Sequence, residues 1–261
     1  MTLRERVALV TGSTSGIGLG VARALAGEGA DIMLNGFGDA EAVESLRLAL
    51  AQEFSVRVEF DDADLTKPQQ VRALVERTQK VLGGLDILVN NAGIQFVAPI
   101  EDFPDDKWDE IIALDLSAVF HAMKVAIPAM KAKGWGRIIN IASAHGLVAS
   151  INKVAYVAAK HAVVGATKVA ALELANDGVT VNAICPGWVL TPLVQQQLES
   201  RAHASSRDVR HESQELLREK QPMLEFTTPE SVGALAVFLC SPAAETMTGS
   251  AISMDGGWVA Q

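Results

Sequence analysis

The chain has 261 residues, of which 49% are apolar and 20% are charged, and this balance excludes a disordered chain. Two cysteines exclude a disulfide scaffold, and no His or Cys spacing fits a metal site. The 22 basic and 31 acidic residues give a net charge of −9, which disfavours nucleic-acid binding. No apolar run approaches the ~18–20 residues of a membrane span, and the N-terminus does not resemble a secretory signal. We therefore expect a cytoplasmic protein without nucleic-acid or membrane partners.

Short β-rich runs alternate with stretches of helical periodicity along the whole chain. The predicted strands are Val7–Val10, Asp31–Leu34, Val56–Phe60, Asp86–Asn90, Arg137–Ala142, Val179–Ile184 and Ala251–Ser253. Strands that are apolar on both faces and linked by helices indicate a parallel sheet covered on both sides. We therefore predict a single α/β domain over residues 1–261, a doubly wound Rossmann sheet of about seven strands.

One segment, at about 188–226, interrupts this alternation between the sixth strand and the next helix. It is long and rich in Gln, Glu, Ser, Arg and His. Because doubly wound sheets bind ligands beyond the carboxyl ends of their strands, we predict a mostly helical substrate lid here. The alternative is a solvated surface excursion.

A glycine-rich loop follows the first strand and opens the first helix. Its glycines, Gly12, Gly16 and Gly18, allow a sharp turn, a close approach of backbone to a pyrophosphate, and tight helix packing. The free N–H groups of the helix start then face the anion. This context predicts a dinucleotide-binding loop, with an ordinary Gly-rich turn as the alternative.

The cofactor preference is read from the run Leu34-Asn35-Gly36-Phe37-Gly38 after the second strand. It holds neither the acid that usually binds the ribose of NAD nor the arginine that accepts the extra phosphate of NADP. Asn35 offers an amide for the ribose, and Phe37 offers an apolar surface near the adenine. Because the loop has no basic residue, we expect NAD.

The single tyrosine of the chain, Tyr156, lies four residues before Lys160 in a predicted helix. Residues at this spacing share a helix face, so the phenol and the ammonium can address one site. A tyrosine acts as a base near neutral pH only where positive charge favours the phenolate, which the lysine supplies. Ser143 ends the fifth strand and can donate a hydrogen bond to a substrate oxygen.

With these residues the chain resembles the short-chain dehydrogenases/reductases over nearly its whole length. The matching motifs, in chain order, are Thr11-Gly12-x-x-x-Gly16-x-Gly18, Asp64-Leu65, Asn90-Asn91-Ala92-Gly93, Ser143, Tyr156-x-x-x-Lys160 and Pro186-Gly187. The resemblance implies hydride transfer between a nicotinamide and an alcohol or ketone. Tyr156 would be the general acid/base, Ser143 would orient the substrate oxygen, and Lys160 would bind the nicotinamide ribose.

The same resemblance implies which residues bind the cofactor, from the pyrophosphate loop through the adenine end to the nicotinamide end. They are Gly12, Thr14, Ser15, Gly16, Ile17, Gly18, Phe37, Asp64, Leu65, Asn91, Ala92, Gly93, Tyr156, Lys160, Pro186, Gly187, Val189 and Thr191.

The chain departs from the family pattern at Asp115, where such enzymes usually carry an asparagine that supports a proton relay to the lysine. A carboxylate cannot donate as an amide does, and its charge would oppose a nearby phenolate. We therefore treat Asp115 as a catalytic-site residue and expect a higher pH optimum than usual. A neutral substitution is the alternative.

Basic and amide side chains are predicted to gather beside the reacting carbon. They are Gln95, His145, Lys153, Trp188 and Gln197, together with Ser143 and Tyr156. A cation and several neutral donors suit a small carboxylate, and Trp188 suits a short methyl group. Each also has a simpler explanation as a surface or packing residue. The set resembles a bacterial group of the family that acts on D-3-hydroxybutyrate, which implies NAD-dependent, reversible oxidation of this hydroxy acid to acetoacetate. It also implies a homotetramer, with the tail 257–261 at a subunit contact.

Two other functions remain open at this point. A 3-oxoacyl-thioester reductase, or another short-chain alcohol dehydrogenase, shares the fold and the catalytic residues. The missing basic loop and the charge of −9 count against a thioester reductase, which needs a basic surface for its acidic carrier. A catalytically weak NAD-binding or sensing protein is the alternative that Asp115 allows.

Overall fold

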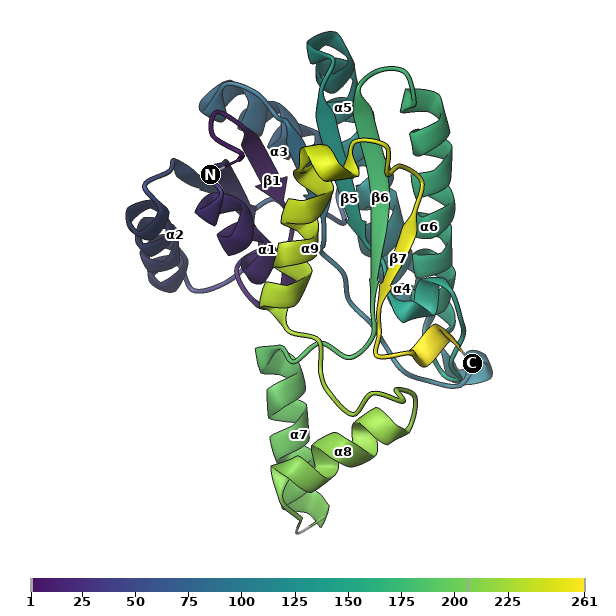
Figure 1. Cartoon of the computed structure of the whole chain (residues 1–261). Helices are drawn as coiled ribbons and strands as arrows, with labels where there is room; N and C mark the ends of the chain where they lie inside the picture. Colours follow the sequence, from purple (N-terminus) through teal and green to yellow (C-terminus); the bar gives the residue numbers. More distant parts are fainter. Residues whose placement is uncertain (1, 206, 261) are drawn as a thin grey trace.

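The computed structural model describes residues 2–205 and 207–260. Within them, seven strands form one sheet in the order β3-β2-β1-β4-β5-β6-β7 (Figure 1). The strands are β1 Val7–Val10, β2 Asp31–Asn35, β3 Val58–Asp61, β4 Ile87–Asn90, β5 Gly136–Ile141, β6 Val179–Pro186 and β7 Ala251–Met254. All neighbouring pairs run parallel. The reversal of strand order between β1 and β4 confirms the doubly wound sheet.

Helices cover both faces of the sheet. They are α1 Gly16–Gly27, α2 Ala40–Phe54, α3 Pro68–Leu82, α4 Asp105–Ile111, α5 Ala118–Lys133, α6 Val154–Leu174, α7 Pro192–Ser205, α8 Val209–Arg218 and α9 Pro229–Cys240. In β1, Val7 and Leu9 pack against α3, α5 and α6, whereas Ala8 and Val10 pack against α1 and α9. Because side chains alternate along a strand, the uninterrupted apolar run of β1 contributes buried side chains to the core on each face of the sheet.

The stretch from α4 to α5 is continuous helix, joined by a wider π-helical turn over Ile112–Ser117. Among the described residues, this stretch, Asp105–Lys133, is the one helix long and apolar enough to cross a membrane. The buried apolar side chains of α5 are Ala118, Val119, Ala122, Met123, Ala126 and Met130, whereas Phe120 is 52% exposed. Packing inside the protein therefore accounts for part of its apolar composition.

The predicted lid is confirmed as mostly helical. Helices α7 and α8 extend beyond the carboxyl edge of the sheet, away from the body of the molecule (Figure 1). Its base is closed by a parallel bridge between Val189 and Thr227. The amide of Leu190 donates to the carbonyl of Thr227, and the amide of Thr227 donates to the carbonyl of Trp188. The outgoing and returning chains are therefore joined before α7 begins.

Candidate active site

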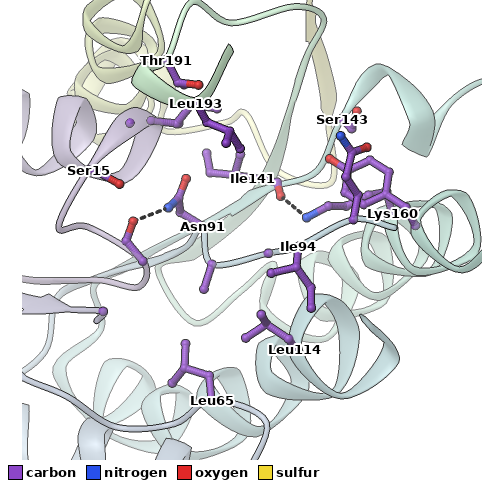
Figure 2. A pocket seen from close by; sticks show the side chains of 18 of the residues that line it. Ser15, Leu65, Asn91, Ile94, Leu114, Ile141, Ser143, Lys160, Thr191 and Leu193 are labelled. Carbon is purple, nitrogen blue, oxygen red and sulfur yellow. Dashed lines mark hydrogen bonds between the residues drawn. The ribbon is translucent and has the colours of Figure 1, made fainter. Parts of the chain in front are cut away.

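A cleft of about 1270 Å³ opens at the carboxyl edge of the sheet, where the strand order reverses between β1 and β4. All of the predicted cofactor residues line it except Gly18, which lies behind the glycine loop. The predicted catalytic residues Ser143, Tyr156 and Lys160 line its far end. Figure 2 shows Ser15 and Thr191 on the opposite side of the cleft from Ser143 and Lys160. The topology thus gathers residues from six loops into one site.

The glycine loop has the backbone shape that its sequence predicts. Gly12 and Gly16 have φ of 60° and 56°, a region that L side chains rarely adopt. A Cβ on Gly18 would lie 2.3 Å from the carbonyl oxygen of Gly12. Gly18 therefore serves close packing of α1 against the loop and does not line the cleft.

Asn91 holds this loop in place from β4. Its Nδ2 donates to the carbonyls of Thr11 and Gly12 at 2.9 and 3.0 Å, and Figure 2 shows it directed at the loop. The hydroxyl of Thr11 in turn accepts from the amides of Asn91 and Ala92. The Asn91 side chain is thus committed to the loop, while Ala92 and Gly93 line the cleft with it.

Asn35 has a different role from the one that its position suggested. Its side chain is buried, its Nδ2 donates to the carbonyls of Asp61 and Ala63, and its Oδ1 accepts from the amide of Gly12. Both amide protons are used within the fold, so the expectation of an amide directed at the ribose is wrong. Phe37 is 69% exposed at the rim of the cleft.

Asp64 and Leu65, which are predicted to contact the adenine, line one end of the cleft. Asp64 Oδ1 accepts from the amide and the hydroxyl of Thr66, and these bonds hold the pKa of Asp64 below its ordinary value. Leu65 is buried beside it and points into the cleft in Figure 2.

Tyr156 and Lys160 lie one turn apart on α6, as predicted. The Lys160 ammonium is 5.4 Å from the centre of the Tyr156 ring and donates to the carbonyl of Ile141 at 3.2 Å. Ser143 is buried at the end of β5, and its hydroxyl accepts from the amide of His145 at 3.1 Å. The Ser143 hydroxyl also lies 3.5 Å from His145 Nδ1, so its proton can be directed to that ring nitrogen or to a substrate oxygen.

Asp115 lies in the π-helical turn, fully buried, directly behind this group. One carboxylate oxygen accepts from the amide of Ile94 at 2.9 Å, and the other lies 3.4 Å from the Lys160 ammonium. Burial raises the pKa of Asp115, while Lys160 and the amide of Ile94 oppose that effect. Burial alone would lower the pKa of Lys160, but the Asp115 carboxylate raises it above its ordinary value. The lysine is thus held as a cation.

The other end of the site is built from rings and one cation. His145 packs edge-to-face on Tyr156 and on Trp258, with ring centres 5.9 and 5.0 Å apart. Burial, with help from the charges of Lys153 and Lys220, lowers the pKa of His145 to about 4, so the ring is neutral at pH 7. The Lys153 ammonium lies 5.7 Å from the Trp188 ring centre.

Trp188 and Trp258 stack with ring centres 6.4 Å apart and form what we call the tryptophan wall. Sequence reasoning missed Trp258, which the C-terminal turn folds back so that it is 7% exposed within one chain. Its only sequence signal is the run Gly256-Gly257-Trp258. The expected subunit contact of the tail concerns 257–261, of which Gln261 lies outside the described residues.

Gln95 and Lys153 line the cleft as predicted, but Gln197 does not. Gln197 is an exposed residue of α7, which extends away from the sheet. The structure therefore brings together six of the seven predicted substrate residues, namely Gln95, Ser143, His145, Lys153, Tyr156 and Trp188.

Comparisons with known proteins agree with this geometry. Residues 12–259 match a family model described as enoyl-(acyl carrier protein) reductase. The chain is 58% identical, over 99% of its length and 100% of the relative, to D-beta-hydroxybutyrate dehydrogenase of Cupriavidus necator. It is 52% identical to D-beta-hydroxybutyrate dehydrogenase of Rhizobium meliloti, over 98% of this chain and 99% of the relative.

Among solved structures, L-sorbose reductase from Gluconobacter frateurii, complexed with NADPH and L-sorbose, superposes with a TM-score of 0.94. It is 33% identical and the match covers 100% of both chains. The fold, the motifs and these relatives agree, and the chain belongs to the short-chain dehydrogenase/reductase family of oxidoreductases.

Proposed function

We propose that this enzyme oxidises D-3-hydroxybutyrate to acetoacetate, reversibly, with NAD as the hydride acceptor. The observation that carries the proposal is the set of groups beside Tyr156. Neutral His145 packs on both Tyr156 and Trp258, and the Lys153 ammonium lies over Trp188 of the tryptophan wall. A cation beside neutral donors suits a carboxylate, and two stacked indoles suit a short methyl group. The names of the two relatives point to the same substrate.

The residues of the cleft fit a dinucleotide. Gly12 and Gly16 supply the turn at the start of α1. A side chain at Gly18 would clash with the carbonyl of Gly12 and displace the loop. NAD, which the glycine loop and the cleft residues up to Lys160 would hold, would supply the acceptor for the hydride of substrate C3. Tyr156 as phenolate removes the hydroxyl proton, Ser143 donates to the same oxygen, and Lys160 favours the phenolate. Reduction of acetoacetate runs the same steps in reverse.

The preference for NAD rests on the loop Gly36–Gly38, which carries no cation for a 2′-phosphate. The L-sorbose reductase was solved with NADPH, and Lys67 of this chain lines the adenine end of the cleft. Turnover with each cofactor in wild type and in Lys67→Ala therefore tests the preference. We expect NAD to be preferred in both proteins. A preference for NADP that Lys67→Ala abolishes would refute it.

We further propose that the enzyme is a cytoplasmic homotetramer and that Gln197 reaches the substrate when the lid closes. The family resemblance supports the assembly. The position of Gln197 on α7, whose first residues line the cleft, supports its approach on closure. Sedimentation of the purified protein tests the assembly, and hydrogen exchange across 188–226 with NAD and a substrate analogue tests the closure.

The carboxylate subsite is tested by comparing D-3-hydroxybutyrate with its methyl ester in wild type and in Lys153→Met. Loss of the cation is expected to raise the KM of the acid about 10- to 100-fold and to leave the KM of the ester nearly unchanged. Lys168→Met, at an exposed lysine of α6, the helix that Lys153 precedes, is the matched control. Equal effects on acid and ester would refute the assignment of Lys153.

A further inference from the structure

Gln221, which follows α8 in the returning chain of the lid, is 1% exposed. Its Oε1 accepts from the amide of Trp188 at 3.0 Å. Its Nε2 donates to the carbonyls of Glu225 at 2.7 Å and Met223 at 3.3 Å. A buried amide with both protons and one oxygen bonded is fixed in position, because each lost bond would leave a buried polar group unpaired.

The Gln221 amide lies between two glycines from different parts of the chain. A Cβ on Gly187, after β6, would lie 2.6 Å from its Oε1. A Cβ on Gly256, in the C-terminal turn, would lie 2.6 Å from its Nε2. The amide of Met223 also donates to the carbonyl of Gly256. The Gln221 side chain therefore fills the space where the end of β6, the lid and the C-terminal turn meet.

Both tryptophans of the wall belong to backbone segments that Gln221 contacts. The Trp188 amide is held by Gln221, and the Trp188 carbonyl is held by the amide of Thr227. Trp258 follows Gly256 by two residues, and its amide donates to the carbonyl of Asp255. Gln221 thus holds the Trp188 backbone by a hydrogen bond and packs against Gly256, two residues before Trp258, in a turn that the Asp255 carboxylate also holds.

We propose that Gln221 is the positioning residue that sets the tryptophan wall against the substrate and thereby determines substrate affinity. This inference rests on the proposed function. It also divides the lid: α7 and α8 are the parts free to move, while the wall stays with the sheet during closure. Gln221 makes no described hydrogen bond to the pyrophosphate loop or to the catalytic residues. It does lie beside Gly187, so we expect its loss to change substrate affinity more than NAD affinity.

The test compares Gln221→Met, which keeps the length of the side chain and removes its bonds, with Gln214→Met, a partly exposed glutamine of α8. The circular-dichroism couplet of the stacked indoles, assigned by its loss in Trp258→Phe, reports the wall directly. We expect Gln221→Met to weaken the couplet and to raise the KM of D-3-hydroxybutyrate about tenfold, with the KM of NAD within twofold of wild type. Gln214→Met should match wild type.

Gly257→Ala, strained at a φ of 87° but clear of Gln221, controls for backbone strain. Gly256→Ala is the second variant, because its methyl group displaces the same amide from the other side, at a φ of 58° that strains an L residue likewise. It should give the same pattern even where Gln221→Met fails to fold. A folded Gln221→Met with an unchanged couplet and substrate KM would overturn the proposal, as would equal rises in the KM of substrate and NAD. If wild type does not oxidise 3-hydroxybutyrate, the proposed function fails, while the couplet still decides whether Gln221 holds the wall.

Discussion

The Asp115 carboxylate lies 3.4 Å from the Lys160 ammonium, and the two side chains are 0% and 5% exposed. Asp115 stands where members of the family usually carry asparagine, so a buried ion pair replaces a neutral amide beside Lys160. Its effect on Tyr156 runs through the lysine, because the carboxylate offsets part of the positive charge that would otherwise favour a phenolate. The pair also explains why Gly93 is glycine: a Cβ there would lie 2.9 Å from Asp115 Oδ2.

Replacing Asp115 by asparagine is expected to move the acidic limb of alcohol oxidation to lower pH by about one unit. The reason is that the variant removes a buried negative charge that disfavours a nearby phenolate. It also removes the group that raises the pKa of Lys160, so loss of the lysine charge would appear as a fall of the basic limb. The measurement is the pH dependence of kcat/KM for oxidation in both proteins. An unchanged limb would mean that the substitution is neutral for catalysis.

Removal of the general base should separate binding from chemistry. In Tyr156→Phe the ring keeps its packing on His145, but no group can take the hydroxyl proton. We expect kcat to fall about 10²- to 10⁴-fold with NADH affinity retained. Steady-state kinetics and NADH fluorescence titration measure the two quantities. A loss of less than tenfold would transfer the base role to another group.

The glycine loop allows a matched pair of substitutions. In Gly18→Ala the new methyl group would lie 2.3 Å from the Gly12 carbonyl and 2.5 Å from Asn91 Nδ2, so the loop must shift. We expect NAD affinity to fall at least about tenfold. Gly165→Ala on α6 meets nothing within 4 Å and should stabilise the protein by about 0.5–1 kcal/mol. Isothermal titration measures the NAD affinity, and chemical unfolding measures the stability. Equal NAD affinity in the two variants would contradict the role of Gly18.

The lowered pKa of His145 makes the free energy of unfolding depend on pH. Burial, and then the charge of Lys153, lowers its pKa from 6.5 to about 4, so the unfolded chain binds a proton that the native state does not between these values. Stability is therefore lost as the pH falls from 6.5 toward 4, by about 3 kcal/mol from this group. Urea unfolding at about pH 7 and about pH 4.5 should show a smaller loss in His145→Gln than in wild type. Equal losses would contradict the assignment.

The fold was predictable from sequence because each strand has its own local signal. All seven predicted strands are present, with ends that differ by one or two residues, such as β3, which begins at Val58 instead of Val56. The Val56 position follows Ser55, which ends α2 in a left-handed conformation, so the strand starts only after that turn. Apolar periodicity carries no information on this local backbone choice.

The site was predictable where its residues belong to short motifs, as with Tyr156 and Lys160. Trp258 and Gln221 were not, because they reach the site through turns that no local pattern encodes. The π-helical turn that places Asp115 against Lys160 has no sequence signal either, since it differs from an α-helix by one residue per turn. Asn35 shows the opposite kind of error. Its position in the sequence suggested a contact to the cofactor, but its side chain bonds to the backbone of the protein itself.

The most direct test of the central claim is the initial rate of NADH formation with D-3-hydroxybutyrate and NAD. The L enantiomer and NADP serve as the two controls in the same assay. We expect rapid turnover with the D enantiomer and NAD, and rates at least about tenfold lower when either is exchanged. Bound NAD without turnover of either enantiomer, in wild type and in Asp115→Asn alike, would contradict the proposed substrate.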